Sequence, residues 1–186
     1  KFVDGMSSSD IQDALIKTAV EKIDIDVPNW TFVAARLFVF DLYHRVGKST
    51  HGIKGEPYCH LKDYLKYGKD AGRLIPNLGE GYDLDDLNSY LAPERDFLFN
   101  YLGIKTLYDR YLIKNNKALP IELPQHMFMA IAMFLAQDEE DKQQRAKEFY
   151  DVVSKFEVML ATPTLSNART NRHQLSSCYI GSSPDN

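Results

Sequence analysis

The segment at residues 127–135 most constrains the fold, because almost all of its residues are apolar. Pro124 lies just before it, and proline suits the first turn of a helix because its missing N–H group needs no partner there. A helix that is apolar on every side is typical of the interior of a fold. The sequence therefore predicts a buried central helix, which other elements must surround.

Apolar residues recur at three- and four-residue spacing through much of the remaining chain, which is typical of amphipathic helices. A serine cluster at residues 7–9 can begin the first of them, since a hydroxyl accepts a hydrogen bond from a first-turn amide. The expected helices cover residues 7–23, 30–47, 58–67, 84–91, 97–111 and 138–158. A small hairpin is expected around the turn-prone Asn115 and Asn116. The predicted class is mainly α, a bundle-like helical domain.

The pattern changes at Ala161. Pro163 does not suit the interior of a continuing helix, Asn167 favours a turn, and residues 174–180 have the length and composition of a strand. A lone terminal strand needs partners, so we expect the rest of its sheet to lie downstream. The chain also begins without methionine, and we expect it to be part of a longer protein.

Composition narrows the classes of function. The chain has a formal net charge of −4 and therefore lacks the excess of basic residues that is typical of a dedicated nucleic-acid binder, so direct nucleic-acid binding is not expected. No apolar run approaches the roughly 20 residues needed to cross a bilayer, so no membrane span is expected. Two cysteines do not make a disulfide framework, and the expected compartment is the cytoplasm.

Chemically, the richest segment is residues 161–180. It gathers hydroxyl and amide side chains, two arginines and Cys178, with little apolar content to bury. Hydroxyls and free amides around a turn can donate to a phosphate, and a strand cysteine can project into a cleft as a redox or nucleophilic thiol. The alternative is an ordinary polar turn followed by an inert packing cysteine. Composition alone leaves both interpretations open.

Residues 162–170 and 174–178 resemble the signature that opens the catalytic barrel of ribonucleotide reductase large subunits. Upstream, residues 4–19 and the Ala-Ala-Arg-Leu run at 34–37 resemble the second half of that family's regulatory ATP-cone and the start of its helical domain. The resemblance divides the chain into a cone remnant with connecting helices at 1–47, a helical domain at 48–160 and the start of the α/β barrel at 161–186.

The resemblance also implies roles for particular residues. Cys178 matches the cysteine that, with a second one downstream, reduces the ribose and becomes a disulfide. Thr162 matches a residue that binds the substrate phosphates, and Ser177 one that lies against the bound nucleotide. Asp185 matches a contact to the effector that sets substrate choice, and Ser8 a cone position that can touch ATP, although an N-cap role explains Ser8 as well.

The same resemblance implies that the chain is the N-terminal part of a class I ribonucleoside-diphosphate reductase large subunit, and we expect it to be inactive by itself. The implied partners are a ribonucleoside diphosphate, a dithiol reductant protein, ATP or deoxynucleotide effectors and a second copy of the full-length subunit. A metal-containing small subunit is expected to supply the radical, with adenosylcobalamin as the alternative source. The competing hypothesis is a helical interaction or regulatory module without a catalytic role.

No metal site is expected. Cys59 and His60, with His51 upstream, lack the paired cysteines that a four-ligand zinc site usually includes. Arg169, Arg172 and His173 are a weak footprint for RNA, because no aromatic residues stand among them to stack on bases.

Overall fold

The computed structural model describes residues 4–50, 57–172, 174–178 and 180–181. Within these ranges the regular elements are all helical. They are α1 (Ser8–Glu21), α2 (Trp30–Thr50), α3 (Leu61–Asp70), α4 (Leu84–Tyr90), the 3₁₀ helix η1 (Pro93–Leu98), α5 (Tyr101–Arg110), α6 (Pro124–Leu135), α7 (Lys142–Ser154) and α8 (Thr162–Asn167). The predicted helical class is confirmed. Among the same residues, no helix combines the length and apolar character that crossing a membrane requires.

Helix α6 is the buried centre of the fold, as the apolar run predicts. Every residue from Pro124 to Met133 is buried. Helix α7 packs along α6, and η1 contacts it as well. Pro124 occupies the first turn of α6, where its lack of an N–H group leaves no donor unsatisfied.

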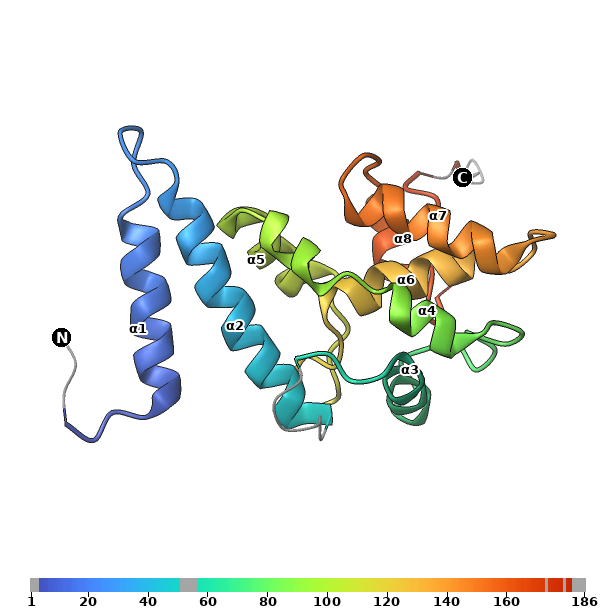
Figure 1. The fold of residues 1–186 in the computed structure, drawn as a ribbon, viewed down its shortest axis with the longest axis horizontal. Coiled ribbons are helices and arrows are strands. Elements are labelled where there is room, and N and C mark those ends of the chain that lie inside the picture. Colours follow the sequence, from blue (N-terminus) through green and yellow to red (C-terminus); the bar gives the residue numbers. More distant parts are fainter. Residues whose placement is uncertain (1–3, 51–56, 173, 179, 182–186) are drawn as a thin grey trace, which may run out of the picture.

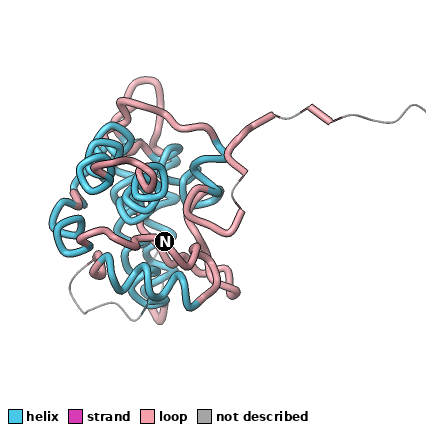
Figure 2. The backbone as a smooth tube through the Cα atoms, turned by 90° about the vertical axis from the view of Figure 1, so that its right-hand side faces the viewer, coloured by secondary structure: helices cyan, strands magenta, loops and turns pink. Residues whose placement is uncertain are grey.

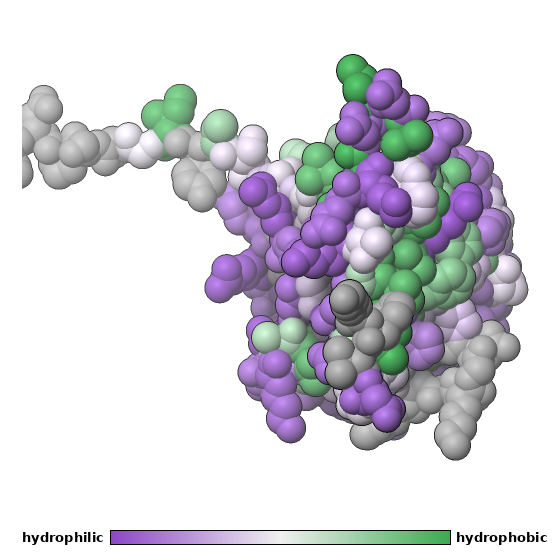
Figure 3. Space-filling model, turned by 90° about the vertical axis from the view of Figure 1, so that its left-hand side faces the viewer, coloured by the Kyte–Doolittle hydropathy of each residue, from purple (hydrophilic) through white to green (hydrophobic). Residues whose placement is uncertain are grey.

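Helices α1 and α2 form an arm at one end of the molecule, and α5 packs on the other side of α2 (Figure 1). The hydroxyl of Ser7 caps α1 by accepting from the amide of Asp10. The expected serine cap is therefore present, but it is Ser7, and Ser8 is the first helical residue. Apolar side chains remain at the surface on the side that carries α1 (Figure 3), and Ile11 and Leu15 of α1 are among the exposed ones.

Several expected helices begin or end elsewhere. Helix α3 starts at Leu61 rather than at residue 58, because His60 caps it and accepts from the amide of Lys62. The helix expected at 97–111 is divided at Asn100, whose side chain caps α5 by accepting from the amide of Gly103. Helix α7 starts only after its cap Asp141 and ends at Ser154 rather than near residue 158.

The expected terminal strand is absent from the described part of residues 174–180, where Figure 2 shows a loop leaving the helical body. Residues 162–167, which we expected to be irregular, form α8 instead. Pro163 lies in the first turn of α8 and starts this helix. The prediction treated Pro163 only as a helix terminator and was wrong there. A strand at 174–180 would need partner strands, and the described residues supply none.

The predicted hairpin is reduced to one antiparallel bridge between Lys114 and Pro120. Its turn is nevertheless well defined. The side chain of Asn115 accepts hydrogen bonds from the amides of Lys117 and Leu119. Because the segment lies beside helices rather than strands, nothing extends the bridge into a sheet. It serves to bring residues 111–113 alongside residues 120–122.

Candidate functional site

A buried ion pair holds the C-terminal segment against the helical domain. The guanidinium of Arg169 binds both carboxylate oxygens of Glu122, with Nε 3.0 Å from Oε2 and the second contact between Nη2 and Oε1. Both side chains are fully buried. The hydroxyl of Tyr64 donates to Oε2 at 2.6 Å, and the amide of Ile113 donates to Oε1 at 2.7 Å. The carboxylate of Glu122 thus has donors on both oxygens, as a buried charge requires.

The rest of the Arg169 side chain is also satisfied. Nη1 donates to the carbonyl of Leu165 at 2.6 Å, and Nη2 donates to the carbonyl of Tyr111 at 2.8 Å. Burial alone lowers the pKa of the guanidinium, but the neighbouring Glu122 outweighs it and raises that pKa above its ordinary value. Arg169 therefore stays charged and joins α8 to the C-terminal end of α5.

Thr162 lies at the exposed start of α8, and the ion pair fixes the other end of that helix. Leu165 and Ala168 are buried against the core. The amide of Ile75 donates to the carbonyl of Arg169 at 3.1 Å. The hydroxyl of Thr162 lies 3.1 Å from the hydroxyl of Tyr111, and either oxygen can be the donor. The predicted substrate-binding threonine is thus held in a defined position at the surface.

Thr162 and Tyr111 stand at the edge of a largely apolar hollow between α5, α8 and the segment that follows α7. Its volume is about 450 Å³. Apolar side chains form most of its lining, including Phe99, Phe128 and Met159. The two hydroxyls therefore give this hollow a polar edge, where a polar group of a ligand can be recognised.

Ser177 and Cys178 lie on the exposed loop beyond α8. The side-chain amide of Asn167 donates to the carbonyl of Gln174 at 2.7 Å and ties the start of this loop to α8. Among the described residues, no hydrogen bond joins Ser177 or Cys178 to Thr162. Thr162 precedes Arg169 in the sequence, whereas Ser177 and Cys178 follow it, and the described structure does not assemble these three predicted substrate-binding residues into one pocket.

Of the two predicted effector residues, the structure describes Ser8. Ser8 is exposed in the first turn of α1. Its expected N-cap role was wrong, because Ser7 accepts the first-turn amide instead. Asp185 lies outside the described residues. The structure therefore locates one of the two predicted effector positions.

A second buried polar cluster surrounds Asp96. Its carboxylate accepts from the hydroxyls of Tyr58 at 2.5 Å and Tyr43 at 2.9 Å, and from the side-chain amide of Gln125 at 2.8 Å. The hydroxyl of Tyr150 in turn donates to the side-chain oxygen of Gln125 at 2.7 Å. Burial raises the pKa of Asp96 to about 6, although the hydrogen bonds from Tyr58, Gln125 and Tyr43 act in the opposite direction. The cluster joins α2, η1, α6 and α7.

His126 is buried next to this cluster. Its ring stacks on that of Tyr64 with 4.6 Å between centroids, and its Nε2 lies 3.0 Å from the carbonyl of Cys59. Because a carbonyl only accepts, Nε2 carries the hydrogen, and Nδ1 is a buried acceptor that has no hydrogen-bond partner among the described residues. Burial lowers the pKa of His126 to about 4, so its ring is neutral at neutral pH.

Cys59 and His60 do not form a metal site in the described structure. Within the described ranges, no group of three or more histidine, cysteine or acidic side chains is placed to hold a metal ion. His60 caps α3, and its Nε2 lies 3.3 Å from a carboxylate oxygen of Asp85. Cys59 is half-buried, and burial raises the pKa of its thiol to about 11.

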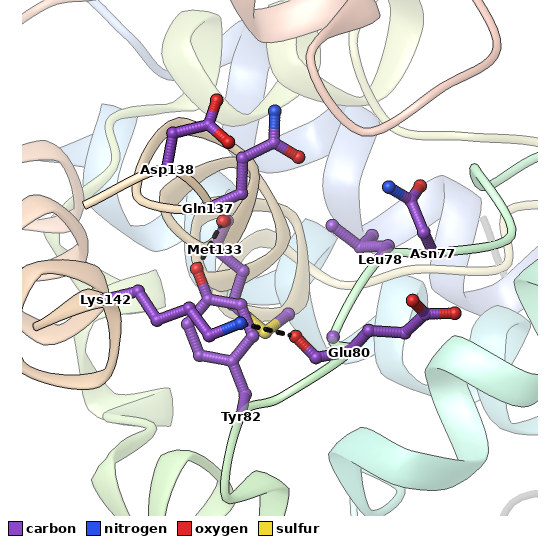
Figure 4. A pocket seen from close by; sticks show the side chains of 9 residues that line it. Asn77, Leu78, Glu80, Tyr82, Met133, Gln137, Asp138 and Lys142 are labelled. Carbon is purple, nitrogen blue, oxygen red and sulfur yellow. Dashed lines mark hydrogen bonds between the residues drawn. The ribbon is translucent and has the colours of Figure 1, made fainter. Parts of the chain in front are cut away.

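A smaller hollow of about 240 Å³ lies between the loop before α4 and the end of α6 (Figure 4). Lys142 reaches across its rim, where its Nζ donates to the carbonyl of Glu80 at 2.8 Å and lies over the ring of Tyr82. The hydroxyl of Tyr82 donates to the carbonyl of Met133 at 2.6 Å. These polar groups bind one another, and none of the predicted site residues lines this hollow.

Neither Tyr111 nor Glu122 was predicted from the sequence as part of the site. Glu122 is 47 residues before its partner Arg169, and nothing in the local pattern pairs them. Arg169 appeared among residues suited to RNA, but its burial removes it from the surface. An isolated acidic residue in an apolar stretch, as Glu122 is between Ile121 and Leu123, is the one sequence feature that indicates a buried ion pair.

Comparison with known proteins gives two kinds of match. Residues 97–173 match the family model described as "Ribonucleotide reductase, all-alpha domain". The whole chain is 61% identical over 186 residues to the ribonucleoside-diphosphate reductase subunit alpha of Helicobacter pylori strain ATCC 700392 / 26695, of which it covers 23%.

More distant relatives carry the same description. The subunit alpha of Treponema pallidum is 38% identical over 172 residues, which are 92% of this chain and 20% of that protein. The ribonucleoside-diphosphate reductase 1 subunit alpha of Escherichia coli K12 is 32% identical over 185 residues, which are 97% of this chain and 24% of that protein. The chain thus spans between a fifth and a quarter of the length of these relatives, and it matches their N-terminal part.

Proposed function

Because this chain belongs to the ribonucleotide reductase alpha-subunit family, we propose that it is the N-terminal part of a subunit that reduces ribonucleoside diphosphates to deoxyribonucleotides. The observation that carries the proposal is the 61% identity to a ribonucleoside-diphosphate reductase subunit alpha over the full 186 residues. In the intact subunit this segment contributes one redox thiol and part of the substrate site. The 186-residue chain alone is expected to be inactive.

Cys178 is proposed as one of two thiols that reduce the ribose. In the balanced reaction, the 2′ carbon–oxygen bond breaks and the oxygen leaves as water. A new carbon–hydrogen bond forms, and the two thiols become one disulfide. A dithiol reductant protein then restores the thiols by exchange. The exposure of Cys178 supports this role, because a thiol that exchanges with substrate and reductant must be reachable.

Thr162 is proposed to contact the substrate phosphates, and Ser177 to lie against the bound nucleotide. The exposed position of Thr162 at the edge of the hollow supports this assignment, because its hydroxyl is accessible to a phosphate oxygen. The radical that starts the reaction is proposed to come from a metal-containing small subunit, with adenosylcobalamin as the alternative. The intact subunit is proposed to dimerise and to work in the cytoplasm.

Regulation by ATP or deoxynucleotides is proposed to involve Ser8 and Asp185. Ser8 is accessible at the start of α1, which supports contact with a nucleotide bound at that end of the arm. The direct check is nucleotide binding to the intact subunit. Ser8→Ala is expected to weaken ATP binding without changing the affinity for substrate, and unchanged ATP binding would remove Ser8 from the proposal.

The central test replaces Cys178 by serine in the intact subunit. Cys178→Ser is expected to bind ribonucleoside diphosphate normally but to lose multiple turnover with a dithiol reductant, because the redox pair cannot form its disulfide. Cys59→Ser is the matched control: this cysteine is half-buried, and its replacement is expected to retain turnover. Normal turnover by Cys178→Ser would refute the proposed redox role.

A further inference from the structure

Tyr111 occupies a junction between the buried ion pair and the surface hydroxyl of Thr162. It is the residue that ends α5, and its amide donates to the carbonyl of Leu107 at 2.9 Å. Its own carbonyl accepts from Nη2 of Arg169 at 2.8 Å. Its main chain is therefore held from both sides, which fixes the direction in which its side chain leaves the backbone.

The side chain of Tyr111 connects this fixed main chain to Thr162. It is half-buried beside the hollow, and its hydroxyl lies 3.1 Å from Oγ1 of Thr162. Thr162 itself is on α8, whose far end Arg169 holds through the carbonyl of Leu165. One buried guanidinium thus sets both partners of the hydroxyl pair.

Two hydroxyls in contact have a useful property toward an anion. Each carries one hydrogen, and their mutual hydrogen bond uses only one of the two. If Tyr111 donates, the Thr162 hydrogen is free to point outward toward a phosphate oxygen. If Thr162 donates, its hydrogen is used by Tyr111, so the phosphate contact proposed for Thr162 selects the arrangement in which Tyr111 donates.

We infer that Tyr111 is a positioning residue for the substrate's diphosphate, acting through the hydroxyl of Thr162. This inference rests on the proposed function, in which Thr162 contacts the substrate phosphates. Without the Tyr111 hydroxyl, the Thr162 side chain loses the partner that restricts its rotation. Substrate binding must then restrict that rotation itself, which costs binding free energy. The expected consequence is weaker binding of ribonucleoside diphosphate rather than a slower chemical step.

The test is a double-mutant cycle in the intact alpha subunit with its radical source. Tyr111→Phe removes only the hydroxyl, and Thr162→Val removes the other one at almost constant shape. Tyr111→Phe is expected to raise KM and the dissociation constant for ribonucleoside diphosphate about 3- to 10-fold, with kcat changed less than about 2-fold. In the Thr162→Val background, Tyr111→Phe is expected to have no further effect, because the partner is already absent.

Tyr90→Phe is the matched control. It also removes a tyrosine hydroxyl that bonds a side chain, since the Tyr90 hydroxyl lies 3.1 Å from a carboxylate oxygen of Asp151, but it does not line the hollow. It is expected to leave KM unchanged. Thermal unfolding of each variant shows whether the fold is retained, and the cycle itself separates positioning from general damage, because damage would persist in the Thr162→Val background.

The outcomes distinguish the inference from the function on which it rests. Three outcomes would overturn the positioning role while leaving the phosphate contact of Thr162 in place. They are wild-type affinity in Tyr111→Phe, an additive loss of affinity in the double variant, and loss of the folded state in Tyr111→Phe. Wild-type affinity in Thr162→Val would instead refute that contact, and the inference would fall with it. A loss in Tyr111→Phe that disappears in the Thr162→Val background supports both.

Discussion

Arg169 and Glu122 form an ion pair in which both side chains are fully buried, and it fastens α8 to the segment just before α6. A buried ion pair does not necessarily raise the free energy of unfolding, since removing two charges from water has a large cost. Here the pair holds the segments that it joins in fixed positions. Its remaining donors reach the carbonyls of Leu165 and Tyr111, so the surface hydroxyls of Thr162 and Tyr111 take their places from a charge in the core.

Arg169→Met is expected to lower the free energy of unfolding by about 3–5 kcal/mol, because the carboxylate of Glu122 stays buried without its cation. Urea unfolding measures this change. Adding Glu122→Leu should recover part of the loss, since no unpaired charge then remains. Arg145→Met, which removes an exposed ion pair with Glu148, is the control and should leave the unfolding midpoint near its wild-type value. An equally small effect of Arg169→Met would contradict the role given to the buried pair.

Asp96 and His126 should affect the pH dependence of stability in opposite directions. The pKa of Asp96 is raised from 3.8 to about 6, so the folded state holds a proton that the unfolded state releases, and stability falls as pH rises between these values. The pKa of His126 is lowered from 6.5 to about 4, so stability falls as pH drops through that range. Each contribution is on the order of 3 kcal/mol, and the two largely cancel between about pH 4 and 6.

Single substitutions should separate these two contributions. In Asp96→Asn the effect of His126 is unopposed, so the free energy of unfolding is expected to fall more steeply on acidification from pH 6 to pH 4 than in the wild type. In His126→Gln the effect of Asp96 remains, and stability is expected to rise over the same interval. Urea midpoints at both pH values measure the slopes. Two variants with the wild-type slope would show that neither group titrates differently in the folded state.

Two helical glycines offer a matched pair for testing the packing. A Cβ at Gly68 of α3 would lie 2.5 Å from Cδ1 of the buried Leu74, whereas a Cβ at Gly47 of α2 would meet no neighbour within 4 Å among the described residues. Gly68→Ala is therefore expected to lower the free energy of unfolding by about 1–3 kcal/mol, because Leu74 must leave its place in the core. Gly47→Ala should instead raise it by up to about 1 kcal/mol through helix propensity. Equal effects of the two substitutions in urea unfolding would contradict the contact at Gly68.

Local patterns predicted the central helix and most of the others, because apolar spacing along a helix is set by neighbours in the sequence. They misplaced boundaries that single side chains decide, as where Asn100 separates η1 from α5. They also misjudged Pro163, which can end one helix or begin another with equal ease. The difference between those outcomes lies in Leu165 and Ala168, whose burial against the core draws residues 162–167 into a helix.

Residues of the candidate site could be proposed from the sequence only where a motif contains them. Thr162, Ser177 and Cys178 follow from the resemblance of one continuous segment. Tyr111 and Glu122 do not, because their roles depend on partners 51 and 47 residues away, Thr162 and Arg169. The polar composition of this segment also could not predict that Thr162 is exposed while Arg169 is buried. Long-range pairing decides which of these polar residues faces solvent.

The two cysteines should differ sharply toward an aromatic disulfide reagent, and this difference can be measured without assaying catalysis. Cys178 is exposed, whereas the half-buried Cys59 has its thiol pKa raised to about 11 from 9.0, first by burial and then by the carboxylate of Asp63. That shift reduces the thiolate fraction of Cys59 about 100-fold at a fixed mildly alkaline pH, and only the thiolate attacks. Labelling should therefore show a fast and a slow phase. Cys178→Ser should remove the fast phase and Cys59→Ser the slow one. A fast phase that survives in Cys178→Ser would mean that Cys178 is not the accessible thiol, and its proposed exchange with a dithiol reductant would lose its structural basis.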